Sequence, residues 1–255
     1  MSGRLEVLAL DPLPEVSEGD GLGALIAGAA ARTGLELADG DIVVVSHKVV
    51  SKSEGRTRDK RTVEPGAEAR RIAAETDRDP RLVELILADS RRVVRATRAA
   101  LIVETSSGWI CANGGIDASN VAGDETVVLL PADPDASARR LRAGLEAATG
   151  ARPGIVIADS FGRPWRRGQT EVAIGCAGVV AVDDWRGRAD AEGRALAATA
   201  IAVADQLASA ADLARAKDSR QPVAVVRGAE RFRTDGDGPG AAAGLQREAA
   251  DDLFR

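Results

Sequence analysis

Three hydrophobic segments, each followed directly by a polar cluster, constrain this chain more than any other feature. The segments 42–45, 109–111 and 155–158 precede the clusters SHKVVSKSEGR (46–56), NGGIDASN (113–120) and DSFGRPWRRGQT (159–170). Short apolar runs of this kind are typical of buried strands. Because a rigid strand fixes the position of the loop at its end, such loops commonly carry binding groups. We therefore expect the three clusters to contribute to a functional site.

The hydrophobic core has to be built almost entirely from aliphatic side chains. The 255 residues include no Tyr, three Phe and three Trp, although 45% of them are hydrophobic. A chain of this length buries a sizeable core, in one domain or in two interlocked ones. So few aromatic residues also argue against a stacking platform for single-stranded nucleic acid.

Strand and helix patterns alternate along the chain. The strand patterns cover 4–10, 39–56, 100–115, 126–131, 153–179 and 222–228, and the helix patterns cover 21–34, 65–76, 80–89, 133–150 and 192–217. The stretches 100–115 and 153–179 each predict two strands, joined in the second case by a polar loop. Strands in hairpins, interspersed with helices, favour an α+β (mixed α/β) fold over a regular βαβ series.

Small residues form a stripe on the predicted helix over 192–217. The stripe consists of Ala197, Ile201, Ala204, Ala208 and Ala211. Small residues at this spacing allow two helices to pack closely, so the stripe suits a contact across a dimer. The last twenty residues, 236–255, are expected to form a linker and a short helical tail.

The charge balance and cysteine usage exclude several classes of protein. The formal net charge is −5, which argues against binding nucleic acid through a broad basic face. No apolar run approaches the ~20 residues of a membrane-spanning helix, and the first residues do not resemble a signal peptide. Cys111 and Cys176 lie far apart in apolar sequence. We interpret them as buried thiols of a cytoplasmic protein with no membrane association.

The cluster 159–170 offers hard oxygen ligands beside cationic side chains. The carboxylate of Asp159 and the hydroxyl of Ser160 suit Mg²⁺ or Mn²⁺. Arginine side chains match phosphate or carboxylate oxygens, and this cluster carries Arg163, Arg166 and Arg167. The alternative is a turn in which Asp159 acts as a cap and the arginines are solvated.

The cluster 113–120 combines two glycines with a carboxylate. Gly114 and Gly115 allow positive φ or close approach of the backbone to a ligand. Paired with Asp159, Asp117 would provide a second carboxylate for a divalent ion, with Asn120 as a neutral hydrogen-bonding partner. The alternative is an Asx turn, in which Asp117 bonds its own backbone.

The cluster 46–56 supplies Lys48, Lys52 and Arg56, and its lysines could hold phosphates as point charges; the alternative is a solvated strand end. His47 is the sole histidine, so a zinc site of the usual His/Cys type is not expected. The G-x-S-x-G and G-x-x-x-x-G-K-[ST] motifs are absent. From the residues alone, we expect an enzyme with a carboxylate-bound metal and an anionic, phosphorylated substrate.

Four segments in order resemble the coenzyme F420-0:L-glutamate ligase family, also called F420 gamma-glutamyl ligase, and most closely the ligase domain of mycobacterial-type two-domain enzymes. The segments are GDIVVVSHKVVSKSEGR, ICANGGIDASNV, ADSFGRPWRRGQTEVAIGCAGV and PVAVVRG. The resemblance implies a GTP-dependent ligase that adds L-glutamate to F420-0 by gamma-linked amide bonds through an acyl phosphate. It also implies Mg²⁺ or Mn²⁺ as two ions, stimulation by K⁺, a family-specific mixed fold and an intertwined homodimer.

The resemblance further implies roles for individual residues. Asp117 and Asp159 correspond to ligands of one metal and Ser160 to a ligand of a second, and Asp117, Asp159 and Lys52 are the expected catalytic residues. The residues expected to bind GTP are Leu13, Pro14, Glu15, Val16, His47, Lys48, Lys52, Asn120 and Lys217. The stretch DLARAKDSRQP (212–222) departs from the family, because it lacks the Gly-rich acidic pattern of many archaeal members.

The resemblance places the ligase domain at 1–235. Two alternative functions fit the same residues: a non-catalytic nucleotide-binding domain and a metal-dependent phosphohydrolase.

Overall fold

A mixed five-stranded sheet forms the centre of the protein. The computed structural model describes residues 3–117, 125–216, 218–237 and 242–253, so Asn120 and Lys217 lie outside the described residues. The strand order is β1-β12-β2-β8-β9, and β2 and β8 are parallel whereas the other neighbours are antiparallel. The bounds are β1 (Glu6–Ala9), β2 (Ile42–Ser46), β8 (Gly154–Arg163), β9 (Arg166–Ala177) and β12 (Val223–Arg227). The mixed sheet with helices confirms the expected α+β class.

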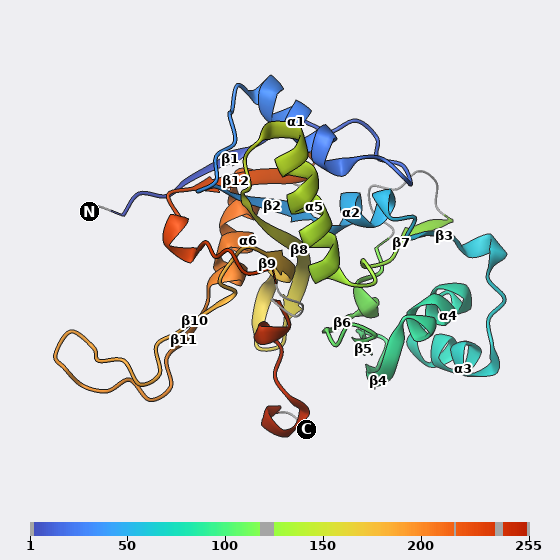
Figure 1. Ribbon diagram of the computed structural model, residues 1–255. Coiled ribbons are helices and arrows are strands. Elements are labelled where there is room, and N and C mark those ends of the chain that lie inside the picture. The colour runs from blue at the N-terminus through green and yellow to red at the C-terminus, as the bar shows by residue number, and fades with distance from the viewer. Residues whose placement is uncertain (1–2, 118–124, 217, 238–241, 254–255) are drawn as a thin grey trace.

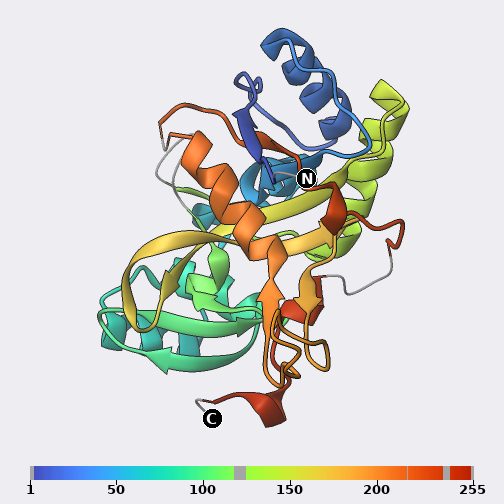
Figure 2. The ribbon, with the colours of Figure 1, turned by 90° about the vertical axis from the view of Figure 1, so that its left-hand side faces the viewer.

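Helices cover both faces of this sheet. Figure 2 shows α1 (Leu22–Thr33) and α5 (Pro134–Thr149) on one side of it and α6 (Val203–Ala214) on the other. The strands between them carry runs of Val, Ile and Ala that are fully buried, as a sheet covered on both faces requires. The core is therefore aliphatic, as the composition predicts.

A second, smaller unit has its own hydrophobic core. It consists of α3 (Ala67–Thr76), α4 (Pro80–Ala88) and a three-stranded sheet of β4 (Ser90–Ala96), β5 (Leu101–Thr105) and β6 (Ile110–Ala112). The chain enters this unit after β3 (Thr57–Asp59) and leaves it before β7 (Thr126–Val128), and these two strands pair with each other. Figure 1 shows the unit beside the main sheet, with β6 on the side facing β8.

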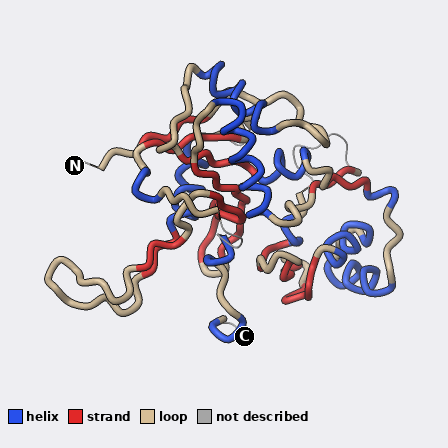
Figure 3. The backbone as a smooth tube through the Cα atoms, viewed as in Figure 1, coloured by secondary structure: helices blue, strands red, loops and turns tan. Residues whose placement is uncertain are grey.

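The helix predicted over 192–217 begins later than expected, because α6 starts at Val203. The residues just before it form strand β11 (Ala200–Ala202), which pairs with strand β10 (Val182–Asp184). The loop between these two strands stands away from the body of the protein (Figure 3). Strand pairing thus overrides the helical propensity of the alanines. Ala204, Ala208 and Ala211 of the small-residue stripe are buried within the chain, where α6 packs on its own sheet.

Two of the three polar clusters also differ from their expected secondary structure. The segment after β2 does not continue as a strand, because the chain turns into helix α2 (His47–Ser53) at once. The predicted loop 159–170 lies mostly inside the β8–β9 hairpin, which extends beyond the edge of the main sheet. The described part of the tail forms 3₁₀ turns that return to the body, where Gln246 Nε2 donates to the carbonyl of Ser107 at 3.0 Å. None of the helices in the described ranges has the length and apolar character needed to cross a bilayer.

The contact between α1 and α5 generates a stability prediction. A Cβ added at Gly23 would lie 2.5 Å from the backbone carbon of Gly144, whereas one added at Gly144 would lie 3.5 Å from Gly23 Cα. Gly23→Ala should therefore destabilise the protein by about 1–3 kcal/mol through overpacking. Gly144→Ala is the matched control and should be neutral or stabilising by up to ~1 kcal/mol, because alanine favours the helix. Urea unfolding of both variants measures the difference, and equal free energies of unfolding would contradict it.

Candidate functional site

The parallel pairing of β2 with β8 brings the first two site residues together. Ser46 and Ala158 are register partners, so the residues that follow them, His47 and Asp159, emerge at the same edge of the sheet. The Nε2 atom of His47 lies 3.3 Å from Oδ1 of Asp159. The same Oδ1 accepts the backbone N–H of Ser160 at 2.8 Å, and Asp159 lies within strand β8, so it does not cap a turn as the alternative interpretation expected.

His47 is buried without a hydrogen bond among the described residues. Its side chain is 1% exposed, and neither ring nitrogen has a hydrogen-bond partner. The contact with Asp159 is close enough for an ion pair but is not aligned as a hydrogen bond.

Asp117 reaches the same helix from the smaller unit. Its Oδ2 lies 2.7 Å from Nζ of Lys48, and its backbone exchanges two hydrogen bonds with Val128 of β7. Gly114 and Gly115 adopt φ angles of 63° and 68°, which glycine takes without strain. The glycines therefore shape the turn as expected, and the Asp117 carboxylate contacts a lysine of α2.

The two carboxylates converge on consecutive residues of one helical turn. Asp159 contacts His47 and Asp117 contacts Lys48, at the start of α2. Strand β6, which precedes the glycine turn, contacts β8, and Trp109 packs edge-on against Phe161 with ring centroids 6.5 Å apart. Each aspartate thus contacts the first turn of α2 through a different residue of that turn.

The loop 13–16 lies beside the other end of α2. Glu15 Oε1 is 2.6 Å from Nζ of Lys52, while Val16 is buried in the main core and Leu13 packs against it. Pro14 is exposed within the same loop. Lys48 and Lys52 are four residues apart, so they lie on one face of α2. That face therefore presents two ammonium groups beside two carboxylates.

Glu171 belongs to this region although the sequence analysis did not select it. Ser160 Oγ donates a hydrogen bond of 2.5 Å to Glu171 Oε1 across the β8–β9 hairpin. Burial raises the pKa of Glu171, and the neighbouring carboxylates Asp212 and Asp159 raise it further, whereas Ser160 and Arg215 oppose the rise. The sequence analysis missed Glu171 because its pairing with Ser160 depends on the hairpin register, which a bulge near Gly162 sets.

The arginines of the polar clusters lie elsewhere. Arg56 donates to the carbonyl of Leu130 at 2.9 Å and to Asp89 at 2.8 Å, which links the segment after β7 to the end of α4 in the smaller unit. Arg163, Arg166 and Arg167 are exposed at the tip of the β8–β9 hairpin, where Arg163 donates to the carbonyl of Arg167. Arg56 thus has a structural role.

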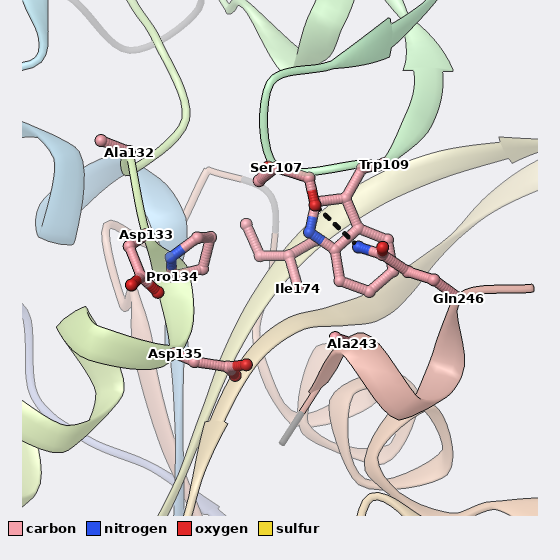
Figure 4. A pocket seen from close by; sticks show the side chains of 9 residues that line it. All are labelled: Ser107, Trp109, Ala132, Asp133, Pro134, Asp135, Ile174, Ala243 and Gln246. Atoms are coloured by element: carbon pink, nitrogen blue, oxygen red, sulfur yellow. Dashed lines mark hydrogen bonds between the residues drawn. The ribbon is translucent and has the colours of Figure 1, made fainter. Parts of the chain in front are cut away.

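A cavity of about 280 Å³ is lined by none of the predicted site residues. Figure 4 shows Trp109, Ile174 and Gln246 around it. Asp135, also in its lining, accepts the backbone N–H groups of Cys176 at 2.8 Å and Ala242 at 3.1 Å. The cavity is therefore closed partly by the C-terminal tail.

The donor set fits a hard divalent cation. Asp117, Asp159 and Ser160 offer oxygen atoms, and the buried His47 ring beside Asp159 has no hydrogen bond within the described ranges. Within those ranges, no three His, Cys, Asp or Glu side chains form a complete metal cluster. Mg²⁺ is commonly held by one or two carboxylates together with substrate phosphates. An ion at this site would need further ligands from a substrate.

The raised pKa of Glu171 generates a prediction on stability. A carboxyl group with a raised folded-state pKa costs stability as the pH rises above its unfolded-state pKa of about 4.3. Glu171→Gln removes the ionised form but keeps an acceptor for Ser160. The free energy of unfolding of the variant, relative to wild type, should therefore increase from pH 4 to pH 7.

Urea unfolding at the two pH values tests this. Glu64→Gln, at a side chain that is 91% exposed, is the control and should show a much smaller change. A relative stability of Glu171→Gln that falls toward pH 7 would contradict the assignment of burial as the dominant cause.

Comparisons with known proteins extend over nearly the whole chain. A protein annotated in Methanopyrus kandleri as "Coenzyme F420:L-glutamate ligase" is 40% identical, over 99% of this chain and 100% of its own. Proteins with the same name from Methanothermobacter thermautotrophicus and Halobacterium salinarum are 40% and 41% identical, each over 91% of this chain and over 93% and 90% of their own. The sequence model of the F420-0:gamma-glutamyl ligase family matches residues 12–228, which include the described site residues. The chain belongs to the F420-0:gamma-glutamyl ligase family and is a ligase of coenzyme F420 gamma-glutamylation.

Proposed function

We propose that the protein uses GTP to add L-glutamate to coenzyme F420-0 through an acyl-phosphate intermediate. One observation carries the proposal: Asp117 and Asp159 meet the first turn of α2, which also presents Lys48. Carboxylates suit a divalent ion and lysines suit phosphates. The site therefore offers ligands for both the metal ion and the phosphates of a metal–nucleotide complex.

The residues have separate roles in this reaction. Lys48 and Lys52 hold the phosphates of GTP, with loop 13–16 alongside, while Asp117 and Asp159 hold one Mg²⁺ or Mn²⁺ and Ser160 contacts a second. When bound, the ions neutralise phosphate charge, which is a major requirement of phosphoryl transfer. A substrate carboxylate attacks the γ-phosphorus and GDP leaves. The glutamate amine then attacks the acyl carbon, and inorganic phosphate leaves as the gamma-linked amide forms.

Further expectations from the family resemblance remain part of the proposal. They are stimulation by K⁺, an intertwined homodimer, contacts of Asn120 and Lys217 with the nucleotide, and action in the cytoplasm. The two buried free thiols, Cys111 and Cys176, support a reducing compartment. The exposed arginines at the hairpin tip suit the acidic tail of the deazaflavin substrate.

Incubation with GTP, Mn²⁺, L-glutamate and F420-0 tests the function directly. Mass spectrometry should detect a product heavier by one or more glutamate units, and GDP should form in proportion. Phosphate release from GTP without glutamate and F420-0 would instead identify a metal-dependent phosphohydrolase. Binding of GTP without any product would identify a non-catalytic nucleotide-binding domain.

Replacing either aspartate should remove activity without unfolding the protein. Asp117→Asn and Asp159→Asn each keep the shape of the side chain but lose the charge that holds a metal. We expect glutamate addition to fall by at least about a hundredfold, since metal ions contribute several kcal/mol to such reactions. Product formation and circular dichroism are the two measurements.

Asp184→Asn provides the control for these variants. Asp184 pairs with Arg186 on the projecting β10–β11 hairpin, away from α2. It should retain wild-type turnover. Turnover near the wild-type level in Asp117→Asn or Asp159→Asn would contradict the metal assignment.

A further inference from the structure

Each of the two lysines of α2 already contacts a carboxylate of the site. Lys48 Nζ lies 2.7 Å from Asp117 Oδ2, and Lys52 Nζ lies 2.6 Å from Glu15 Oε1. Lys48 and Asp117 are 18% and 33% exposed, so this pair is largely shielded from water, whereas Lys52 is 13% exposed and its partner Glu15 is 78% exposed. A shielded charge pair is screened less than one on an open surface.

Lys48 therefore competes for the oxygen that the proposed function gives to a metal. An ammonium group and a divalent ion on the same carboxylate would stand within a few ångströms of each other. Repulsion between like charges at that distance is strong where water is partly excluded. The Asp117 carboxylate therefore binds the ion more tightly once Lys48 has moved away to another anion.

The incomplete metal cluster indicates a second contribution of the nucleotide. Within the described residues, no group of three His, Cys, Asp or Glu side chains could hold an ion alone. Phosphate oxygens can complete the coordination of Mg²⁺. They can also accept the ammonium groups of Lys48 and Lys52. A nucleotide would therefore supply missing ligands and remove a competing cation.

We propose that Lys48 and Lys52 are exchangeable counter-cations that couple metal binding to nucleotide binding. In the unliganded protein they neutralise Asp117 and Glu15. On nucleotide binding they transfer to the phosphates, and Asp117 becomes available to the metal. The inference rests on the metal and nucleotide roles in the proposed function. Because coupling between two ligands is reciprocal, each ligand raises the affinity of the other.

Mn²⁺ binding to the whole protein tests the coupling without any turnover. Free Mn²⁺ is measured by electron paramagnetic resonance in titrations with and without saturating GDP. For the wild type, GDP should raise the Mn²⁺ affinity by roughly five- to a hundredfold. For Lys48→Met, Mn²⁺ should bind several-fold more tightly than to wild type in the absence of nucleotide, and the increase with GDP should shrink.

Two further variants serve as controls. Lys60→Met removes a lysine that is 14% exposed and lies 3.6 Å from Asp79 Oδ2, outside the site, so it should match the wild type in both titrations. Lys48→Arg keeps a cation opposite Asp117 and should leave the nucleotide-free Mn²⁺ affinity near the wild-type value. This variant also separates loss of the charge from damage to the fold.

The direction in which Lys48→Met changes the nucleotide-free Mn²⁺ affinity tests the inference. An unchanged nucleotide-free Mn²⁺ affinity would show that Lys48 contacts phosphates without competing for Asp117, and would overturn it. A weaker affinity in both Lys48 variants would show a structural role, and would also overturn it.

The ligase assay, a separate experiment, tests the proposed function. Ligase activity together with a Mn²⁺ affinity that GDP does not change overturns the inference alone. Coupling that is lost in Lys48→Met, in a protein that forms no glutamylated product, supports the inference and overturns the ligase mechanism.

Discussion

The parallel pairing of β2 with β8 is the contact on which the site depends. Among the described strands of the main sheet it is the one parallel pair, and it sets two carboxyl ends side by side. The chain can then place His47 on the helix that follows one strand and Asp159 on the extension of the other. Both strands are covered on two faces, so their positions are rigid. An antiparallel pairing would have sent the two residues to opposite edges.

The second unit completes this edge from outside the sheet. Strands β3 and β7 connect the unit to the main body, and the backbone of Asp117 is bonded to β7. The glycine turn lets β6 run against β8 before the chain reaches Lys48. The two sides of the site, one with Asp159 and the other with Asp117, thus rest on different hydrophobic cores. At the junction the two lysines of α2 each pair with a carboxylate from another segment, Asp117 or Glu15.

Much of the site was predictable because strand ends and polar clusters are both local patterns. Asp117, Asp159 and Lys48 were selected in this way; Lys48 lies in the first turn of α2, and the two aspartates contact Lys48 and His47 there. Glu171 was missed because its contact with Ser160 depends on a bulge in the β8–β9 hairpin. The start of α6 was predicted too early, since alanine-rich sequence favours helix until a partner strand competes for it.

The sequence by itself determined the aliphatic core, the α+β class and the identity of the polar clusters, because these follow from composition and short-range periodicity. The tertiary structure alone decided which groups face each other. Arg56 and Lys48 stand in the same cluster, yet one links the segment after β7 to the smaller unit and the other meets Asp117. Strand register and helix phase set these partners, and both depend on contacts between residues far apart in the chain.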